Sequence, residues 1–187
     1  MLVRRILIAG MGNVLRRDDG FGVEVTRQLT ERNGLPPQAD LIEVGIGGIH
    51  LVQKLIDCYD VLVIVDAVDR GEPPGSLKLL RVDVPDLTMW PEDEQRDFLA
   101  DMHYATPSRA LVLARALGVL PPRVFILGCQ AGDFFDLGIG LTEPVRQATK
   151  EAAIEIERLV REVLHGQGST DITGAQGGAG EERPHPT

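Results

Sequence analysis

The sequence predicts an α/β fold: a three-layer sandwich in which a mostly parallel five-stranded sheet carries helices on both faces. Strand-like and helix-like segments alternate along the chain, a pattern typical of parallel strands joined by helical crossovers. The run Val61–Val65 contains only Val, Leu and Ile, as expected for a central strand that is buried on both faces. Apolar residues recur at helical spacing in several of the intervening segments, which indicates helices that pack one face on a sheet.

Each expected element has its own local signal. Short apolar runs predict strands, and turn residues bound them. A Pro that follows Thr opens two of the helices, because Thr caps the free N–H groups and Pro presets the helical φ angle. The expected strands are Ile6–Ala9, Leu41–Val44, Val61–Val65, Ser76–Val84 (an edge strand) and Arg123–Leu127, and the expected helices are Gly20–Arg32, His50–Asp57, Thr106–Gly118 and one that opens at Thr142–Pro144.

Two segments lack a sustained period. Residues 85–105 hold two prolines, the sole tryptophan and many acids, and we expect a long surface loop with a short helix near Glu92–Phe98. Loops of this length in compact domains are usually functional or disordered. From residue 166 onward Ile172 is the only large apolar side chain, which predicts a disordered tail at 166–187 after a single domain at 1–165.

Composition excludes several classes of protein. The net charge is −9, so a nucleic-acid partner is not expected. No run approaches the ~20 apolar residues of a membrane span, and the N-terminal apolar run is too short for a signal-peptide core. The cysteines, Cys58 and Cys129, stand far apart, each in or beside an apolar stretch. We therefore expect two reduced thiols in or near the core of a cytoplasmic protein.

The segment after the first expected strand, Gly10-Met11-Gly12-Asn13, invites comparison with a dinucleotide-binding loop. That motif needs a third glycine where this chain has Leu15. It also needs an acid after the second strand, where Val44 and Gly45 stand. Asp18 and Asp19 would moreover place negative charge where a pyrophosphate binds. We therefore expect no nucleotide.

Acidic side chains and one histidine converge on the same edge of the predicted sheet. Asp18 and Asp19 precede the helix that starts near Gly20. Capping of the N-terminus of this helix explains one of the two acids but does not need both. Asp66 ends the most apolar strand, where an ionised carboxylate needs a partner or a cation. His103 precedes the helix at Thr106, at the same end of the sheet. Two carboxylates and an imidazole with open positions suit a working site for Ni²⁺, Zn²⁺, Fe²⁺ or Mn²⁺.

Other candidates have structural explanations. His50 follows a glycine-rich loop at Gly45–Ile49; it is either a helix-surface histidine or a substrate contact, since glycines let another backbone approach closely. Cys129 lies just past the fifth expected strand and is interpreted as a buried structural thiol. The sequence contains no nucleophile elbow and no paired-histidine zinc helix. The catalytic group is therefore not assigned.

The segment from Gly10 to Gly22, GMGNVLRRDDGFG, resembles the opening signature of the hydrogenase maturation proteases. Val65-Asp66-Ala67 resembles the strand-end aspartate of that family, and His103, ahead of a Pro-initiated helix, resembles its third ligand. The resemblance covers residues 4 to 164. It implies a twisted sheet between helices and a cytoplasmic endopeptidase that removes a C-terminal extension from the large-subunit precursor of [NiFe] hydrogenase after nickel insertion.

The resemblance also implies a ligand set of Asp19, rather than Asp18, with Asp66 and His103, and a nickel ion that the precursor carries. One departure stands out: many members have Asp-Gly-Gly-Thr after the second strand, where this chain has Gly45-Ile46-Gly47-Gly48-Ile49-His50. Two mechanisms stay open, a metal that acts as a Lewis acid and a substrate metal that positions the tail for cleavage; we expect the second. The alternative function is a non-proteolytic nickel-binding assembly chaperone.

Overall fold

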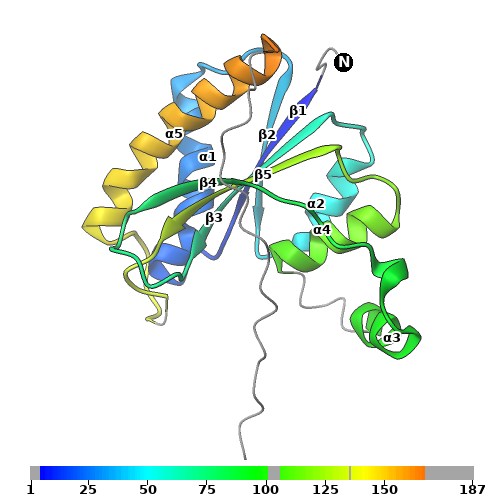
Figure 1. Ribbon diagram of the computed structural model, residues 1–187. Helices are drawn as coiled ribbons and strands as arrows, with labels where there is room; N and C mark the ends of the chain where they lie inside the picture. The colour runs from blue at the N-terminus through cyan, green and yellow to red at the C-terminus, as the bar shows by residue number, and fades with distance from the viewer. Residues whose placement is uncertain (1–4, 101–105, 135, 167–187) are drawn as a thin grey trace, which may run out of the picture.

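A computed structural model describes residues 5–100, 106–134 and 136–166 of the chain. Strands and helices alternate through most of it (Figure 1). The elements are β1 (Ile6–Met11), η1 (Arg17–Gly20), α1 (Phe21–Arg32), β2 (Ala39–Gly45), α2 (Gly48–Leu55), β3 (Val61–Val68), β4 (Leu77–Arg81), η2 (Leu87–Met89), α3 (Glu92–Ala100), α4 (Pro107–Ala116), β5 (Arg123–Gln130) and α5 (Glu143–Leu164).

The strands form one five-stranded sheet in the order β2-β1-β3-β5-β4. All neighbouring pairs are parallel except β4 with β5, which is antiparallel at the edge. Helices α1 and α5 cover one face and α2 and α4 the other (Figure 1). The predicted three-layer fold is therefore confirmed, including the edge position of the fourth strand.

Side-chain alternation along the strands creates two separate cores. In β3, Val61, Val63 and Val65 pack toward α1 and α5. The alternate residues Leu62 and Ile64 pack toward α2 and α4. All five are fully buried, which explains why this strand is apolar on both faces.

Strands β3 and β5 are longer than the sequence predicts. Both were expected to end at the last large aliphatic residue, Val65 or Leu127. Their pairing instead continues to Val68 and Gln130, although β1 pairs with β3 only as far as Val65. Asp66 therefore lies within β3, not after it, and the prediction that Cys129 follows the fifth strand is wrong: Cys129 lies inside β5.

The predicted helix boundaries hold to within two residues at most ends. Thr106 caps α4, and its side chain accepts from the N–H of Arg109 at 3.4 Å. Thr142 occupies the N-cap position of α5 in an extended conformation. Asn33 ends α1 in the left-handed region with φ of 49°. Thr106 therefore makes the cap that the sequence predicts, whereas Thr142 makes no side-chain cap hydrogen bond and donates its hydroxyl to Asp18 instead.

Residues 85–100 leave the three layers and form η2 and α3, which projects beside α4 (Figure 1). The short predicted helix at Glu92–Phe98 is confirmed. It is held by an edge-on contact of Trp90 with Phe98, whose ring centroids are 5.5 Å apart, and by the guanidinium of Arg109 over the Phe98 ring. Residues 101–105, which include His103, and residues 167–187, which make up nearly all of the predicted tail, lie outside the described residues.

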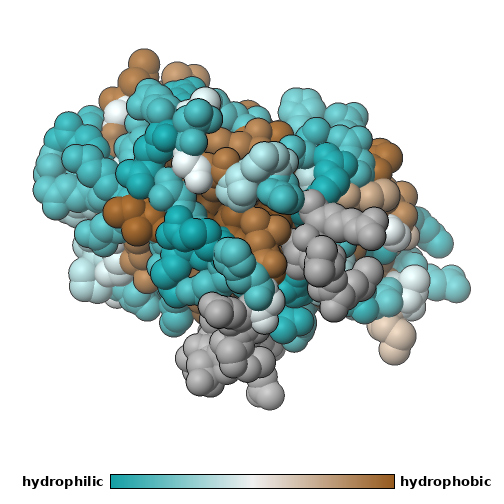
Figure 2. Space-filling model, turned by 90° about the horizontal axis from the view of Figure 1, so that it is seen from above, coloured by the Kyte–Doolittle hydropathy of each residue, from teal (hydrophilic) through white to brown (hydrophobic). Residues whose placement is uncertain are grey.

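None of the helices within the described ranges is long and apolar enough to cross a membrane. Viewed from the side where β1 begins, the surface is mainly hydrophilic, and hydrophobic atoms show as patches between polar ones (Figure 2). The predicted site lies on the opposite side of the molecule, at the carboxyl ends of the parallel strands.

Candidate functional site

The strand order has a topological switch between β1 and β3. The chain passes from β1 through α1 to β2 on one side, then returns through α2 to β3 on the other side of β1. The connections diverge at this point, and ligands of open α/β sheets bind in the resulting crevice at the carboxyl ends of the strands. Asp19 follows β1 and Asp66 belongs to the last part of β3, so both lie at the switch.

Asp19 lies in η1, the turn that leads from β1 into α1. Its Oδ2 accepts a hydrogen bond of 3.1 Å from the backbone N–H of Asn13, and its own N–H donates to the carbonyl of Arg16. Burial raises the pKa of Asp19, while the Asn13 N–H and the charge of Arg16 act in the opposite direction. The side chain is thus fixed in place and its charge is only partly compensated.

Asp66 has the more strongly perturbed carboxyl group. Its pKa is raised from 3.8 to about 7, mainly by burial and in addition by the negative charge of Asp19. The opposing contribution is a 3.0 Å hydrogen bond from the adjacent N–H of Ala67. A cation at this position would relieve both the burial of the charge and the repulsion between the two acids.

Two of the three predicted ligands are therefore brought together, and the third, His103, lies outside the described residues. Within those residues no group of three or more His, Cys, Asp or Glu side chains is arranged to hold a metal ion. Asp19 and Asp66 supply hard oxygen donors, which fit a divalent first-row ion once a third donor is added.

The glycines of the opening segment allow the backbone of α1 to approach the strand ends. A Cβ on Gly22 would lie 2.1 Å from the carbonyl oxygen of Val65, and one on Gly10 would lie 2.3 Å from that of Gly22. Gly12 has φ of +119°, and its Cβ would lie 1.7 Å from the carbonyl oxygen of Asp19. These glycines bring Asp19 up to β3, a role that the glycine spacing in the sequence does not indicate.

The same geometry weighs against a phosphate at the loop. The N–H of Asn13 donates to the Asp19 carboxylate, and the N–H of Gly12 donates to the carbonyl of Gly45. In a phosphate-binding loop such groups point at the ligand.

Asp18 does not cap the helix, contrary to one interpretation of the sequence: η1 and α1 show no side-chain cap hydrogen bond. Its carboxylate is fully buried and accepts from the N–H groups of Gly132 and Asp133 and from both the N–H and the hydroxyl of Thr142. Asp18 thereby ties the β1–α1 loop to the β5–α5 loop. In the sequence, only the presence of two adjacent acids, Asp18 and Asp19, points to this role.

Gln130, the last residue of β5, organises the loop that follows β3. Its Oε1 accepts from the N–H of Arg70 at 2.7 Å, and its Nε2 donates to Asp69 at 3.1 Å and to the carbonyl of Ala131. The residue is buried. No sequence pattern singles it out.

The Gly45–His50 segment lies beside the site. Gly45 has φ of +63°, and Ile46 in the loop is 74% exposed. His50 is exposed in the first turn of α2, so its predicted position on the helix surface is confirmed, and its role as a substrate contact stays a prediction.

The two cysteines differ from each other. Cys129 is fully buried, and burial raises the pKa of its thiol to about 12 with a further contribution from Asp18, which fits the predicted inert structural thiol. Cys58 is exposed, so the expectation that both thiols lie in or near the core is wrong for it. Its apolar neighbours belong to the strand and helix on either side of an exposed turn.

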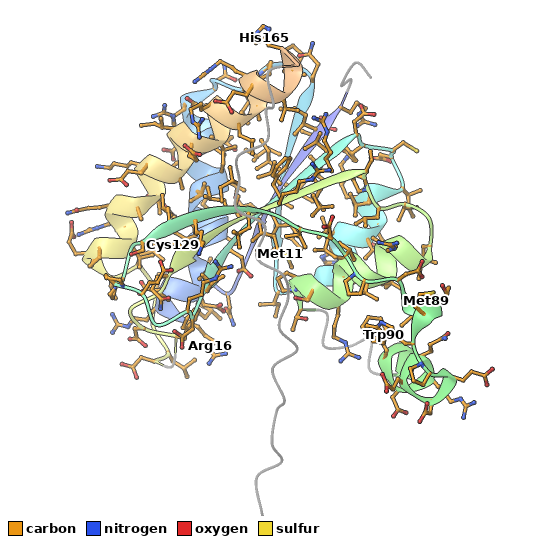
Figure 3. The ribbon with its side chains drawn as sticks, viewed as in Figure 1. Met11, Arg16, Met89, Trp90, Cys129 and His165 are labelled. Atoms are coloured by element: carbon orange, nitrogen blue, oxygen red, sulfur yellow. The ribbon has the colours of Figure 1, made fainter. Side chains whose placement is uncertain are left out.

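Figure 3 shows where the site lies in the molecule. Arg16, in the loop after β1, lies on the lower side and Met11, the last residue of β1, near the middle, both well below His165 at the end of α5. The loop that carries Asp19 is therefore at the far edge of the sheet from the C-terminal end of α5.

Comparisons with known proteins agree with this architecture. The family model described as hydrogenase maturation protease matches residues 23–159. The chain is 36% identical over 160 residues to the hydrogenase expression/formation protein HoxM of Azotobacter vinelandii, with 83% of this chain and 72% of that protein covered. It is also 36% identical over 143 residues to HupD of Bradyrhizobium diazoefficiens, with 76% and 70% covered.

Solved structures show the same fold. The hydrogenase 2 maturation peptidase of a Thaumarchaeota archaeon superposes with a TM-score of 0.62 at 30% identity, covering 84% of this chain and 98% of that one. The hydrogenase maturating endopeptidase HybD of Escherichia coli gives a TM-score of 0.66 at 26% identity, covering 84% and 93%.

The fold, the acidic switch point and these relatives define a peptidase built on a doubly wound sheet. The chain belongs to the hydrogenase maturation protease family, and the resemblance to that family is confirmed.

Proposed function

We propose that this protein is the endopeptidase that removes the C-terminal extension of a [NiFe] hydrogenase large-subunit precursor, and that it recognises nickel already bound to that precursor. The proposal rests on the family and on one observation of the site. Two carboxylates, Asp19 and Asp66, lie at the switch point close enough that the charge of Asp19 raises the pKa of Asp66. Such a pair is stabilised by an incoming cation.

In this account the nickel ion belongs to the substrate. The precursor brings the ion to the carboxylates of Asp19 and Asp66, and His103 supplies the third donor. Two oxygens and one imidazole nitrogen form a ligand set that first-row ions accept. The protein ligands then leave other positions on the ion for the precursor's own ligands, as an open site requires.

Recognition of the ion also positions the scissile peptide. Anchoring the metal fixes the adjacent backbone of the precursor in the crevice, and such positioning converts an encounter into an effectively intramolecular reaction.

The carboxyl group of Asp66 also responds to binding of the cation through its protonation. Its pKa of about 7 means that the carboxyl group holds a proton in part of the population at neutral pH, and binding of the cation releases that proton.

The partner in this proposal is the large-subunit precursor, and the compartment is the cytoplasm. An assembly chaperone with the same ligands is the competing function. The two differ in product: a protease releases a peptide, whereas a chaperone retains the metal and releases none.

The test is tail release from purified, nickel-loaded precursor, measured by mass spectrometry. We expect the wild-type protein to release one C-terminal peptide, and Asp19→Ala, Asp66→Ala and His103→Ala each to lose release while they remain folded by circular dichroism. Tight retention of nickel by the isolated protein without any peptide release would support the chaperone. Full activity of any of the three variants would remove that residue from the site.

A further inference from the structure

We propose that the β1–α1 loop and the β5–α5 loop together form a docking surface for an apolar segment of the precursor that adjoins the cleavage site. We call this surface the paired-loop surface and define it by Leu15, Arg16, Leu137, Gly138 and Ile139. The inference rests on the proposed function for the identity of the partner. The surface itself follows from exposure, pairing and position.

The paired-loop surface displays aliphatic side chains to solvent. Leu15 is 56% exposed, Leu137 83% and Ile139 84%. Single exposed aliphatic residues are normal on soluble proteins, but several that lie together mark an interaction site. Leu137 and Ile139 are the two most exposed large hydrophobic residues in the described part of the chain.

The backbone pairing brings these side chains together. Arg16 and Gly138 form an isolated parallel β-bridge. Its hydrogen bonds run from the N–H of Gly138 to the carbonyl of Leu15 at 2.9 Å and from the N–H of Arg17 to the carbonyl of Gly138 at 3.0 Å. Each exposed aliphatic residue is therefore adjacent in sequence to a bridged residue, although the two loops are more than a hundred positions apart in the sequence; paired backbones lie about 5 Å apart.

Buried hydrogen bonds and an ion pair also hold the two loops together. The buried carboxylate of Asp18 accepts from Gly132, Asp133 and Thr142 of the second loop, and Arg17 lies 3.7 Å from Asp133 across the same junction. A surface that is already ordered loses little conformational entropy when a partner binds. The exposed aliphatic side chains therefore sit on a rigid base.

The paired-loop surface is continuous with the acidic pair. The N–H of Asp19 donates to the carbonyl of Arg16 at 3.1 Å, so the residue that forms the bridge also fixes the first acid. A chain segment bound at Asp19 and Asp66 would therefore have this loop next to it. The occupant with the best fit is thus the part of the precursor next to its metal and scissile bond.

Charge specifies the occupant further. The protein carries a net charge of −9, yet this surface presents the exposed Arg16, while the neighbouring Arg17 is paired with Asp133. Aliphatic side chains beside the Arg16 guanidinium suit a segment with apolar residues and at least one carboxylate. We expect the precursor to supply that combination close to its cleavage site.

The experiment compares a paired-loop variant, Leu137→Ser/Ile139→Ser, with a matched control variant, Ile56→Ser/Leu117→Ser. The control residues are 61% and 59% exposed and stand just before β3 and β5, at the opposite edge of the sheet. Both variants and the wild type are measured for tail-release kinetics, for binding to nickel-loaded precursor by interferometry, and for thermal midpoint.

The paired-loop variant should raise KM and weaken precursor binding about tenfold or more, as loss of central apolar anchors does. Its kcat and thermal midpoint should stay close to wild type, and the control variant should change nothing. Unaltered KM and binding in the paired-loop variant would overturn the docking surface while wild-type cleavage still upheld the proposed function.

Three further outcomes also decide the matter. If the wild type binds the precursor but does not cleave it, the proposed activity is wrong and the docking surface is judged from binding alone. If the wild type neither binds nor cleaves, both proposals are wrong. If the paired-loop variant changes a dimer into a monomer by analytical ultracentrifugation, with precursor affinity intact, the surface is a self-association interface and the proposal is overturned.

Discussion

The carboxylates of Asp19, in the turn after β1, and Asp66, in β3, interact, and the negative charge of Asp19 adds to burial in raising the pKa of Asp66 to about 7. The close approach depends on glycines that let α1 contact the ends of β1 and β3. Such shifted carboxyl groups cluster at functional sites, because their arrangement costs stability in the absence of a ligand. Four consequences can be measured on the protein itself, before any precursor is added.

Asp66 should make the metal-free protein less stable as the pH rises. Below pH 3.8 the carboxyl group is neutral in both states; between pH 3.8 and about 7 the unfolded chain releases its proton and the folded protein retains it. The free energy of unfolding therefore falls across this window, by at most about 4 kcal/mol. Urea denaturation at pH 5 and pH 8 in the presence of a chelator should show a smaller decrease for Asp66→Asn than for wild type. Equal decreases would contradict the assigned pKa.

Asp19→Asn should lower the pKa of Asp66, because it removes a negative charge that favours the protonated form. The shift should be partial, since burial is the larger cause and persists in the variant. Carboxyl ¹³C NMR titration of Asp66 measures it directly. Asp136→Asn serves as the control, because this exposed acid does not contribute to the Asp66 pKa. A pKa that is the same in wild type and Asp19→Asn would show that the two acids are not coupled.

Asp18→Ala should be among the most destabilising single changes in the chain. It removes a buried acceptor of hydrogen bonds from Gly132, Asp133 and Thr142 and leaves those donors without that partner. We expect a loss of about 3 kcal/mol in the free energy of unfolding. Asp136→Ala, in the same β5–α5 loop, should change it by less than about 0.5 kcal/mol. Similar values for the two variants would show that Asp18 does not hold the β1–α1 and β5–α5 loops together.

Gly22→Ala should destabilise the protein through backbone contact. The added Cβ would lie 2.1 Å from the carbonyl oxygen of Val65 and 2.4 Å from that of Met11, so α1 must move away from the strands. The expected cost is about 3 kcal/mol, in the range of overpacking. Gly47→Ala is the control, since the three atoms nearest to its Cβ would all belong to the side chain of His50, the first at 2.9 Å, and that side chain can turn away. If both variants unfold at the same urea concentration, the close approach does not constrain the fold.

The sequence predicts the layers and the site region because both depend on local signals. Val61–Val65 identifies the central strand, and Thr106 and Thr142 mark helix starts. Where the prediction is wrong, the cause is a contact between residues that are far apart in the sequence. Strand β3 extends past Val65 because β5 continues to pair with it, which no local pattern encodes. The buried role of Asp18 was not predicted, because its partners lie more than a hundred positions away along the chain, and Gln130 acts through a single side chain in an otherwise ordinary strand.

The residues of the candidate site differ for the same reason in how well the sequence predicts their positions. Asp19 belongs to a dense local signature and Asp66 to a buried strand, and the structure brings both to the switch point. His103 stands in a segment without periodicity and outside the described residues, so its place as the third ligand stays a prediction. The paired-loop surface has no sequence signal, because it arises where two distant loops meet.

The most direct test of the proposed function compares tail release from nickel-loaded and nickel-free precursor under identical conditions. If Asp19 and Asp66 recognise the substrate's metal, the nickel-loaded precursor should be cleaved at least about a hundredfold faster, the factor expected when a positioning interaction is lost. Adding nickel to the protease alone should not restore cleavage of nickel-free precursor. Equal rates on the two precursors would contradict the account.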